Sequence, residues 1–417
     1  MKLAPRVIII GGGLSGLSCA LRLKEAEVPF LLLEASKHLG GRVQTDHFDE
    51  YFLDRGFQVL LTAYPEAQRM LDYSQLDLKP FHASALVRCQ GKIYKISDLF
   101  RHPLDVFTSL FTPIGTLDDK FKLFKLKERI LRTSLNELEL HPETTTLEFL
   151  KNEGFSESMI KRFFRPLFSG IFLDPALNTS SHMFELVFRM LSEGPAALPG
   201  EGIGAISRQL AKKLPPASVR TNARVLSLQD GIINLGQAET LGAEAIVVAT
   251  DGIDAAKLLP DLPAPTYRSV MCLYYAALKP PWEEPILLLN GDNKGPINNV
   301  SVLSNVCLKY APEGHSLISV SVLGYNDEEE LEFEATVRKQ LVEWFPEDAI
   351  KWRYLRAYKI KHAQPNQNPP ALASLQRPVK LRQGVFVCGD HRDTASIQGA
   401  LMSGRRAAEA VLADLPA

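Results

Sequence analysis

The stretch "VIIIGGGLSGLSCALRLKEAEVPFLLLEAS", from Val7 to Ser36, decides the fold of this chain. Its apolar run Val7–Ile10 predicts a buried strand, and the glycines that follow predict a tight turn. A helix is expected from Ser15 to about Glu25, and "FLLLE" predicts a second strand that ends at Glu34. This order of strand, glycine-rich turn, helix and strand indicates an α/β fold.

The glycine spacing indicates what the turn binds. Gly11, Gly13 and Gly16 form a GxGxxG pattern: the first permits the turn, the second lets a pyrophosphate approach the backbone, and the third lets the helix pack on the strand. Glu34 follows at the distance where an acid accepts hydrogen bonds from an adenosine ribose, and its charge disfavours the 2′-phosphate of NADP. The stretch therefore predicts a dinucleotide site at the helix N-terminus.

Composition excludes several other classes. The chain has 417 residues, a net charge of −1 and 46% hydrophobic residues, so we expect a large globular core and no nucleic-acid partner. No apolar stretch approaches the ~20 residues of a membrane-spanning helix, and no signal peptide is recognised. The cysteines form no CxxC pair, which favours free thiols in a reducing, cytoplasmic environment and argues against a zinc site. They are Cys19, Cys89, Cys272, Cys307 and Cys388.

A second glycine pair identifies a family resemblance. "HLGGRVQT" contains Gly40, Gly41 and Arg42, and "YFLDRGFQV" contains Asp54 and Gly56. GxGxxG, a strand-ending Glu, GGR and Asp-x-Gly, in this order, resemble the start of a flavoprotein superfamily. That superfamily contains amine oxidases, protoporphyrinogen oxidases, renalases, and carotenoid desaturases and isomerases.

The far end of the chain resembles the same superfamily. In "GVFVCGDHRDTASIQGALMSGRRAAEAV" a strand, Val385–Cys388, leads to Gly389 and Asp390, and a helix begins near Gln398. The resemblance implies that Asp390 contacts the ribityl chain or pyrophosphate region. It also implies that backbone N–H groups near Ala400 to Met402 face the flavin pyrimidine, where a helix dipole stabilises negative charge.

The resemblance implies FAD as the cofactor. Binding is expected to be non-covalent, because the attachment cysteine of amine oxidases has no counterpart after Cys388. Val225 and the pair Ala249–Thr250 would lie beside the adenosine half, and Gly56, Phe57 and Gln58 nearest the flavin ring. No metal cluster or catalytic side chain has a recognisable spacing. The implied cofactor-binding residues are Gly11, Gly13, Leu14, Ser15, Gly16, Glu34, Ala35, Gly40, Gly41, Arg42, Gly56, Phe57, Gln58, Val225, Ala249, Thr250, Gly389, Asp390, Gln398, Gly399 and Ala400.

The predicted organisation is an FAD-binding, Rossmann-like domain of the glutathione-reductase type, interleaved with an α+β substrate domain. Residues 1–66, 200–264 and 375–417 are assigned to the FAD-binding domain. Residues 67–199 are mostly helical in pattern, and residues 265–374 are strand-rich, which predicts a mostly antiparallel sheet.

A second glycine pattern occurs within "LPGEGIGAISRQLAKKLP". Gly200, Gly202 and Ala205 match GxGxxA, and a second nucleotide site would indicate an NAD-linked reductase. No strand is predicted before the pattern, which favours a loop that leads into a helix.

One departure from the family bears on the reaction. Amine oxidases of this superfamily carry a Lys that holds a water at flavin N5, and in "SVMCLYYAALKPPW" Cys272 stands at that position. We therefore expect an FAD-dependent oxidoreductase that removes a hydride from, or desaturates or isomerises, a small hydrophobic substrate of isoprenoid or tetrapyrrole-like type. The alternatives are an amine or amino-acid oxidase and a non-catalytic flavin-binding protein.

The segment "DDKFKLFKLKERILR", Asp118 to Arg132, has two interpretations. Phe121, Phe124 and its lysines could form a helix face for peripheral membrane contact. The same pattern also fits an amphipathic helix that covers its own core, which is the commoner case.

Overall fold

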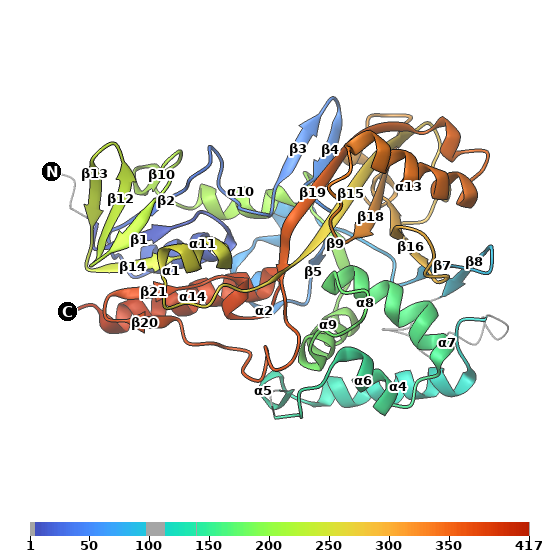
Figure 1. Cartoon of the computed structure of the whole chain (residues 1–417), viewed down its shortest axis with the longest axis horizontal. Helices are drawn as coiled ribbons and strands as arrows, with labels where there is room; N and C mark the ends of the chain where they lie inside the picture. The colour runs from blue at the N-terminus through green and yellow to red at the C-terminus, as the bar shows by residue number, and fades with distance from the viewer. Residues whose placement is uncertain (1–4, 97–112, 139, 417) are drawn as a thin grey trace.

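The computed structural model describes residues 5–96, 113–138 and 140–416. Residues 1–4 of the predicted FAD-binding segment, residues 97–112 of the predicted helical segment and residues 139 and 417 lie outside this description. Figure 1 shows a sheet near the two termini, a larger sheet on the opposite side, and a group of helices beneath the larger sheet. Two long strands, β15 (Tyr267–Ala277) and β19 (Arg353–Pro365), run from the centre into the larger sheet.

The sheet near the termini has six strands in the order β10-β2-β1-β14-β21-β20. Its strands are β1 (Val7–Ile10), β2 (Phe30–Leu33), β10 (Val219–Arg220), β14 (Ala245–Val248), β20 (Lys380–Arg382) and β21 (Val385–Val387). All are parallel except the edge strand β20. Helix α1 (Leu14–Glu25) joins β1 to β2, whereas β14 lies on the other side of β1, so the strand order reverses there. Doubly wound sheets bind ligands at the carboxyl ends of strands that flank such a reversal.

The first and last helices of the chain pack against each other beside this sheet. Helix α14 (Ile397–Asp414) crosses α1 where a Cβ on Gly404 would lie 2.1 Å from the Ser15 carbonyl oxygen, so only glycine permits the approach. Across the same contact, Ser18 Oγ donates a hydrogen bond to the Leu401 carbonyl at 2.6 Å.

Smaller elements surround the six-stranded sheet. A three-stranded antiparallel meander follows β10, and short strands and helices connect the sheet to the rest of the molecule. These elements are β3 (Thr45–Phe48), β4 (Tyr51–Asp54), β5 (Leu60–Leu61), α2 (Pro65–Met70), α3 (Tyr73–Leu76), β6 (Lys79–Pro80), β9 (Ala196–Leu198), α10 (Gly204–Lys212), β11 (Ser227–Gln229), β12 (Ile232–Gly236), β13 (Glu239–Gly242) and α11 (Gly252–Leu258).

The larger sheet has seven strands in the order β19-β15-β18-β17-β16-β7-β8. Besides β15 and β19 it contains β7 (Ala85–Cys89), β8 (Lys92–Ile96), β16 (Leu287–Asn290), β17 (Ile297–Val302) and β18 (Ser316–Leu323). Helix α13 (Glu330–Trp344) packs on one face of this sheet, and the short helix α12 (Leu303–Val306) follows β17. Strands β7 and β8 differ from the mostly helical pattern predicted for residues 67–199. Strand β7 is held by parallel pairing with β16, about two hundred residues away, which a local pattern does not reveal.

The helical part packs around phenylalanines. Two of its helices begin with a capping box, Thr116 with Asp119 and Thr145 with Glu148, as Thr signals before apolar runs predict. Phe168 and Phe184 lie in the buried centre, with ring centroids 4.6 Å apart. The helices are α4 (Leu117–Arg132), α5 (Leu135–Leu138), α6 (Thr146–Asn152), α7 (Glu157–Met159), α8 (Arg165–Phe172) and α9 (Ser181–Glu193), with a π-helical turn at Ile160–Phe164.

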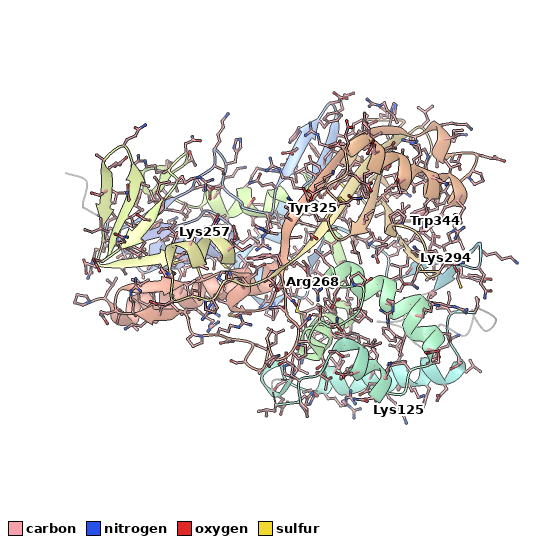
Figure 2. The ribbon with its side chains drawn as sticks, in the orientation of Figure 1. Lys125, Lys257, Arg268, Lys294, Tyr325 and Trp344 are labelled. Carbon is pink, nitrogen blue, oxygen red and sulfur yellow. The ribbon has the colours of Figure 1, made fainter. Side chains whose placement is uncertain are left out.

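Helix α4 contains the segment with two interpretations. Its buried stripe, Leu123, Leu126 and Ile130, packs into the core of the helical part. Phe121 is 56% exposed and lies against Lys125, which Figure 2 shows at the outer side of α4. Part of the apolar pattern is therefore core packing, and membrane contact stays a prediction. Within the described residues, no helix is long and apolar enough to cross a bilayer.

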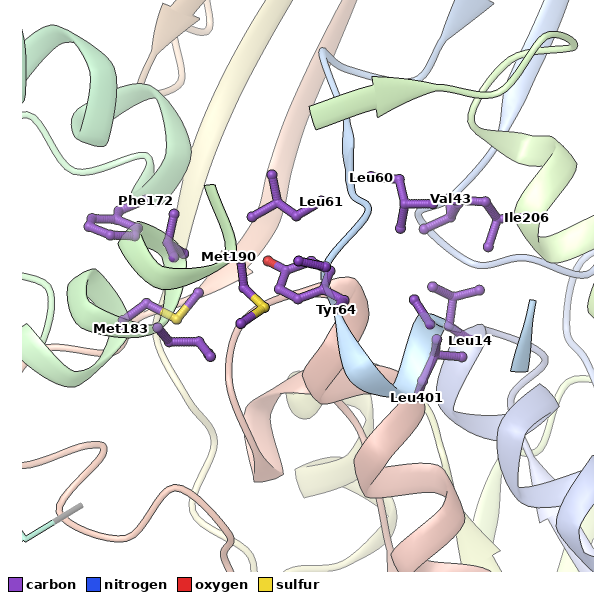
Figure 3. Packing of buried hydrophobic residues seen from close by; sticks show 14 of the residues in the cluster. Leu14, Val43, Leu60, Leu61, Tyr64, Phe172, Met183, Met190, Ile206 and Leu401 are labelled. Atoms are coloured by element: carbon purple, nitrogen blue, oxygen red, sulfur yellow. The ribbon is translucent and has the colours of Figure 1, made fainter. Parts of the chain in front are cut away.

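One core connects the helical part to the six-stranded sheet. Figure 3 shows Phe172 and Met183 packing towards Tyr64, and Leu14 and Leu401 completing the cluster on the side of α1 and α14. Arg268, at the centre of Figure 2, pairs with Asp174 at 3.2 Å and donates to Asn368 Oδ1 at 2.9 Å. Packing and ion pairs therefore fix the helical part relative to β15.

Candidate active site

The glycine turn after β1 contains two kinds of glycine. Gly11 has a φ of +110°, and a Cβ on Gly16 would lie 2.0 Å from the Gly11 carbonyl oxygen, so the chain itself requires both. Gly13 has an ordinary φ of −73°, and the nearest atom to a Cβ there is the Gly41 Cα at 3.9 Å. Packing does not explain Gly13. The missing side chain of Gly13 leaves open space beside the start of α1, and the N-terminus of α1 has no side-chain cap. A pyrophosphate would fit this space and would accept hydrogen bonds from the uncapped N–H groups.

Leu14 and Ser15 form the first turn of α1, next to this space. Glu34, at the end of β2, holds the turn in place. Its carboxylate accepts the Gly12 N–H at 2.7 Å and the Ser36 N–H at 2.8 Å. Ala35 lies between Glu34 and Ser36 in the sequence. Each carboxylate oxygen of Glu34 keeps a further lone pair for a ribose hydroxyl. The sequence analysis did not predict that Glu34 also holds the glycine turn through these two hydrogen bonds. Its position directly before a turn is the sequence feature that could have indicated this role.

The glycine pair Gly40–Gly41 is hydrogen-bonded to the glycine turn after β1. The Gly40 N–H donates to the Gly12 carbonyl at 2.8 Å, and Gly40 and Gly41 both have positive φ, +124° and +58°. Gly41 thereby faces Gly13, and both glycines border the same open space.

Arg42 connects three parts of the site. Its Nη2 donates to both Asp390 oxygens at 2.7 Å, and its Nη1 donates to the Ala363 carbonyl at 2.6 Å. Burial lowers the pKa of the Arg42 guanidinium, but the ion pair with Asp390 outweighs burial and raises that pKa above its ordinary value. Gln58 Nε2 donates to the Arg42 carbonyl at 3.1 Å. The structure therefore brings together Arg42, Gln58 and Asp390, which are far apart in the sequence.

The turn after Asp54 lies against the larger sheet. Gly56 has a φ of +90°, and its missing Cβ would lie 2.9 Å from Ile360 of β19. Phe57 packs edge-on against Phe81. This turn therefore packs against β19 of the seven-stranded sheet, and its place beside the flavin ring stays a prediction.

Asp54 itself has a structural role and accounts for the GxGxxA pattern. It is buried and accepts hydrogen bonds from Thr45, from the Ile203 N–H and from Tyr310. Burial raises the pKa of the Asp54 carboxyl to about 6, against the effect of these donors. Because Ile203 precedes α10, the carboxylate already occupies the N-terminus of that helix, where a second nucleotide would place its phosphates.

A strand does precede that pattern, contrary to the sequence prediction. It is the short antiparallel strand β9, which pairs with β5 and β6. A strand of this kind does not form the parallel βαβ unit that a dinucleotide site requires.

The segments predicted to lie beside the adenosine half are a strand end and a loop. The Ala249 N–H donates to the Ile10 carbonyl at 2.8 Å, so Ala249 and Thr250 follow β14 next to the glycine turn. Val225 lies between β10 and β11 and packs, partly buried, against the core on that side of the sheet.

The start of α14 differs in detail from the prediction. The Gly399 N–H is capped by Ser396 Oγ at 3.0 Å, and the Ala400 N–H donates to the Ser396 carbonyl. Residues Ala400 to Met402 therefore lie inside the helix, and their N–H groups are not its free donors. The first-turn donors without an acceptor in the described chain are those of Ile397 and Gln398, while the Gln398 side chain accepts the Glu66 N–H.

His391, which sequence reasoning did not single out, follows Asp390. It is 4% exposed and lies between Gly389 and Gly252. Neither ring nitrogen has a hydrogen-bond partner among the described residues, and burial lowers the pKa of His391 to about 4. Its position directly after a strand-ending Gly-Asp is the signal that could have found it.

Cys272, at the position of the amine-oxidase Lys, is fully buried in β15. Its Sγ lies 3.3 Å from Ser319 Oγ. Burial raises the pKa of the Cys272 thiol to about 11, so the thiol is neutral at pH 7.

Comparison with known proteins identifies the family of the chain. Residues 14–412 match the family described as flavin containing amine oxidoreductase. Coproporphyrinogen III oxidase of Mycobacterium tuberculosis is 24% identical over 222 residues, which are 50% of this chain and 45% of the relative. Polyamine oxidase 1 of Zea mays is 51% identical over 45 residues, 11% of this chain and 9% of the relative. The chain therefore matches less than half the length of these curated relatives.

A solved structure from Exiguobacterium sp. 255-15 has the same fold. Its TM-score is 0.75 at 18% identity, and the alignment covers 99% of each chain. The chain belongs to the flavin-containing amine oxidoreductase family and has a mixed α/β fold.

Proposed function

We propose that the chain uses FAD to remove a hydride from, or to desaturate or isomerise, a hydrophobic, conjugated or partly saturated substrate of isoprenoid or tetrapyrrole-like type. The observation that carries this proposal is Cys272, a neutral, fully buried thiol in the wall where amine oxidases carry a Lys.

The lengths of the alignments support the same choice. The match to polyamine oxidase covers 45 residues, whereas the match to coproporphyrinogen III oxidase covers 222 residues. A 45-residue match is only somewhat longer than the GxGxxG stretch from Val7 to Ser36, a motif typical of Rossmann-type dinucleotide-binding domains. The longer match includes positions outside that motif.

When bound, FAD supplies a two-electron acceptor, and the protein supplies position and electrostatics. In this proposal the N-terminus of α1, with Gly13 and Gly41, holds the pyrophosphate, and Glu34 binds the ribose. Arg42 and Asp390 hold the ribityl and pyrophosphate region. The first turn of α14 places N–H donors where negative charge develops. The apolar core at Phe172 and Met183 excludes water on the substrate side.

An anaerobic reduction experiment tests the proposal. The holoenzyme is mixed without oxygen with coproporphyrinogen III, with a partly saturated carotenoid, or with putrescine, and the flavin absorbance is followed. We expect bleaching with a substrate of the first two kinds and none with putrescine. Bleaching by putrescine alone would establish the amine-oxidase alternative. Because isomerisation causes no net reduction of the flavin, the products are also analysed, and a flavin that no substrate reduces, together with no isomerised product, would support a non-catalytic role.

A further inference from the structure

The face of the seven-stranded sheet opposite α13 carries two rows of polar side chains. In the first row Asn299 of β17 pairs with Ser321 of β18, which pairs with Cys272 of β15. In the next row Ser301 pairs with Ser319, which pairs with Tyr274. Cross-strand partners point to the same face of a sheet. We call this set the polar floor: Cys272, Tyr274, Asn299, Ser301, Ser319 and Ser321.

Two members of the polar floor are buried without partners. Asn299 is 3% exposed and Ser301 is 1% exposed. The Asn299 Oδ1 and the Ser301 Oγ have no hydrogen-bond partner in the described part of the chain. A buried polar atom without a partner is costly, so two such atoms on one face indicate that something else satisfies them.

The polar floor lies between the helical part and the turn beside the flavin. On one side, a Cβ on Gly170 of α8 would come within 3.0 Å of Asn299 Nδ2, and Ser169 donates to the neighbouring Asn298 at 2.9 Å. On the other side, Tyr274 donates from its hydroxyl to the Asp54 carbonyl at 2.8 Å. The Phe57 backbone contacts the Cys272 thiol. A ligand on the floor would therefore be next to the predicted flavin-ring segment.

The chemistry of the floor is neutral. All six members are uncharged residue types, and burial keeps the pKa of both Cys272 and Tyr274 above their ordinary values. Beyond Asn299 and Ser301 the same rows continue into Leu289 and Leu287 of β16, which are apolar. The Asp54 carboxylate lies near the end of the floor formed by Cys272 and Tyr274, whereas the floor residues themselves supply no carboxylate for an ammonium group. A pure hydrocarbon would leave the oxygens of Asn299 and Ser301 unsatisfied.

We propose that the polar floor binds a neutral hydroxyl, carbonyl or amide group of the substrate through Asn299 and Ser301. The inference rests on the proposed function and narrows it to a hydrophobic substrate that bears such a group, rather than a plain hydrocarbon or an amine.

Three probes with one carbon skeleton test this selectivity: farnesol, farnesylamine and farnesene. Each is titrated into the holoenzyme, and binding is read from the perturbation of the flavin absorption spectrum. We expect farnesol to bind about tenfold more tightly than the other two, as one hydrogen bond provides. Equal binding of farnesene, tighter binding of farnesylamine, or no response to farnesol would overturn the proposal.

A matched set of variants adds a readout that does not depend on the probe. Asn299→Leu and Ser301→Ala remove unpartnered polar atoms, so the thermal midpoint of the ligand-free holoenzyme should rise while the preference for farnesol disappears. The control is Ser304→Ala, because the buried Ser304 hydroxyl accepts the Leu317 N–H at 3.0 Å. That variant should lower the midpoint and leave the probe preference unchanged.

A lower midpoint in both Asn299→Leu and Ser301→Ala would mean that these groups serve the fold, which would overturn the proposal. Anaerobic reduction of the flavin distinguishes failure of the polar-floor proposal from failure of the proposed function. If the inference alone is wrong, a hydrophobic substrate still reduces the flavin anaerobically or is isomerised, whereas failure of the proposed function leaves the flavin oxidised and every such substrate unchanged.

Discussion

Gly13 and Gly41 face each other at the carboxyl edge of the six-stranded sheet, where a Cβ on Gly41 would lie 3.2 Å from the Gly13 Cα. Neither residue could carry a side chain without narrowing the space between them. Two glycine turns, from separate motifs, therefore border one site for a phosphate group.

Substitution of two neighbouring glycines separates binding from folding. Gly13→Ala should change the stability of the apoprotein by no more than about 1 kcal/mol, since a Cβ fits there, and should weaken FAD binding roughly 10- to 100-fold. Gly16→Ala should destabilise the protein by about 3 kcal/mol or more, because its Cβ meets the Gly11 carbonyl. Apoprotein melting and titration with FAD measure both effects. Unchanged FAD affinity in Gly13→Ala would show that no ligand occupies this space.

Replacement of Glu34 tests the ribose contact. Glu34→Gln should weaken FAD binding by about 1.5–3 kcal/mol, because a charge-assisted hydrogen bond to the ribose is lost. The amide still accepts one of the two N–H groups that Glu34 holds, so the loss of stability should be smaller than in Glu34→Ala. Glu25→Gln, at the exposed end of α1, is the control and should bind FAD normally. Normal binding in both variants would place Glu34 away from the ribose.

His391 should make stability depend on pH. Its pKa is about 4 in the folded protein and 6.5 ordinarily, so the unfolded chain takes up a proton between these values and the folded protein does not. Wild-type apoprotein should therefore lose stability as the pH falls from 6.5 to 4, by up to about 3 kcal/mol relative to His391→Gln. The pKa values of Asp54 and Asp393, both raised to about 6, act in the opposite direction. These two groups are common to both proteins, so their effect cancels in the comparison. Parallel stability curves for the two proteins would contradict the assignment.

FAD should be released by acid. All five cysteines are buried, and none follows Cys388 in the sequence. Acid precipitation of the holoenzyme should give a yellow supernatant with the mass of FAD. A colourless supernatant above a yellow pellet would mean that the flavin is covalently attached.

Membrane contact through α4 depends on its outward side. Leu117 and Phe121 are more than half exposed, and Lys125 lies beside them. Liposome flotation with anionic lipid should recover the protein in the upper fraction, and Phe121→Asp should abolish this while FAD is retained. If the wild-type protein stays at the bottom of the gradient, α4 does not bind the membrane.

Local motifs predict the residues of the candidate cofactor site, and the structure brings several of them together. Gly11, Gly16 and Glu34 lie within 24 residues of each other, and their roles follow from the chemistry of one turn. The family shown by the comparisons and the mixed α/β fold agree with the sequence prediction. The ion pair of Arg42 and Asp390 spans 348 residues, so the motifs indicated each residue but not their contact.

Two features that the sequence did not indicate, the partner of β7 and the polar floor, depend on pairing between strands that are distant in the sequence. The parallel pairing of β7 with β16 was missed, because a short apolar strand has no pattern that names its partner. The polar floor was also missed, although the alternation in "SLISVSVL" placed Ser319 and Ser321 on one face. Only the register with β17 shows that Asn299 and Ser301 continue the same rows.

The crossing of α1 and α14 sets the order of events during synthesis. Gly404 approaches the Ser15 carbonyl too closely for any other residue, and β21, just before α14, completes the sheet beside β14. The ribosome therefore makes the glycine turn after β1 first. Strand β21 and helix α14, which pack beside this part of the fold, are made only about 380 residues later. We therefore expect FAD loading to be a late step, because a nascent chain that stalls before Val385 lacks both β21 and α14.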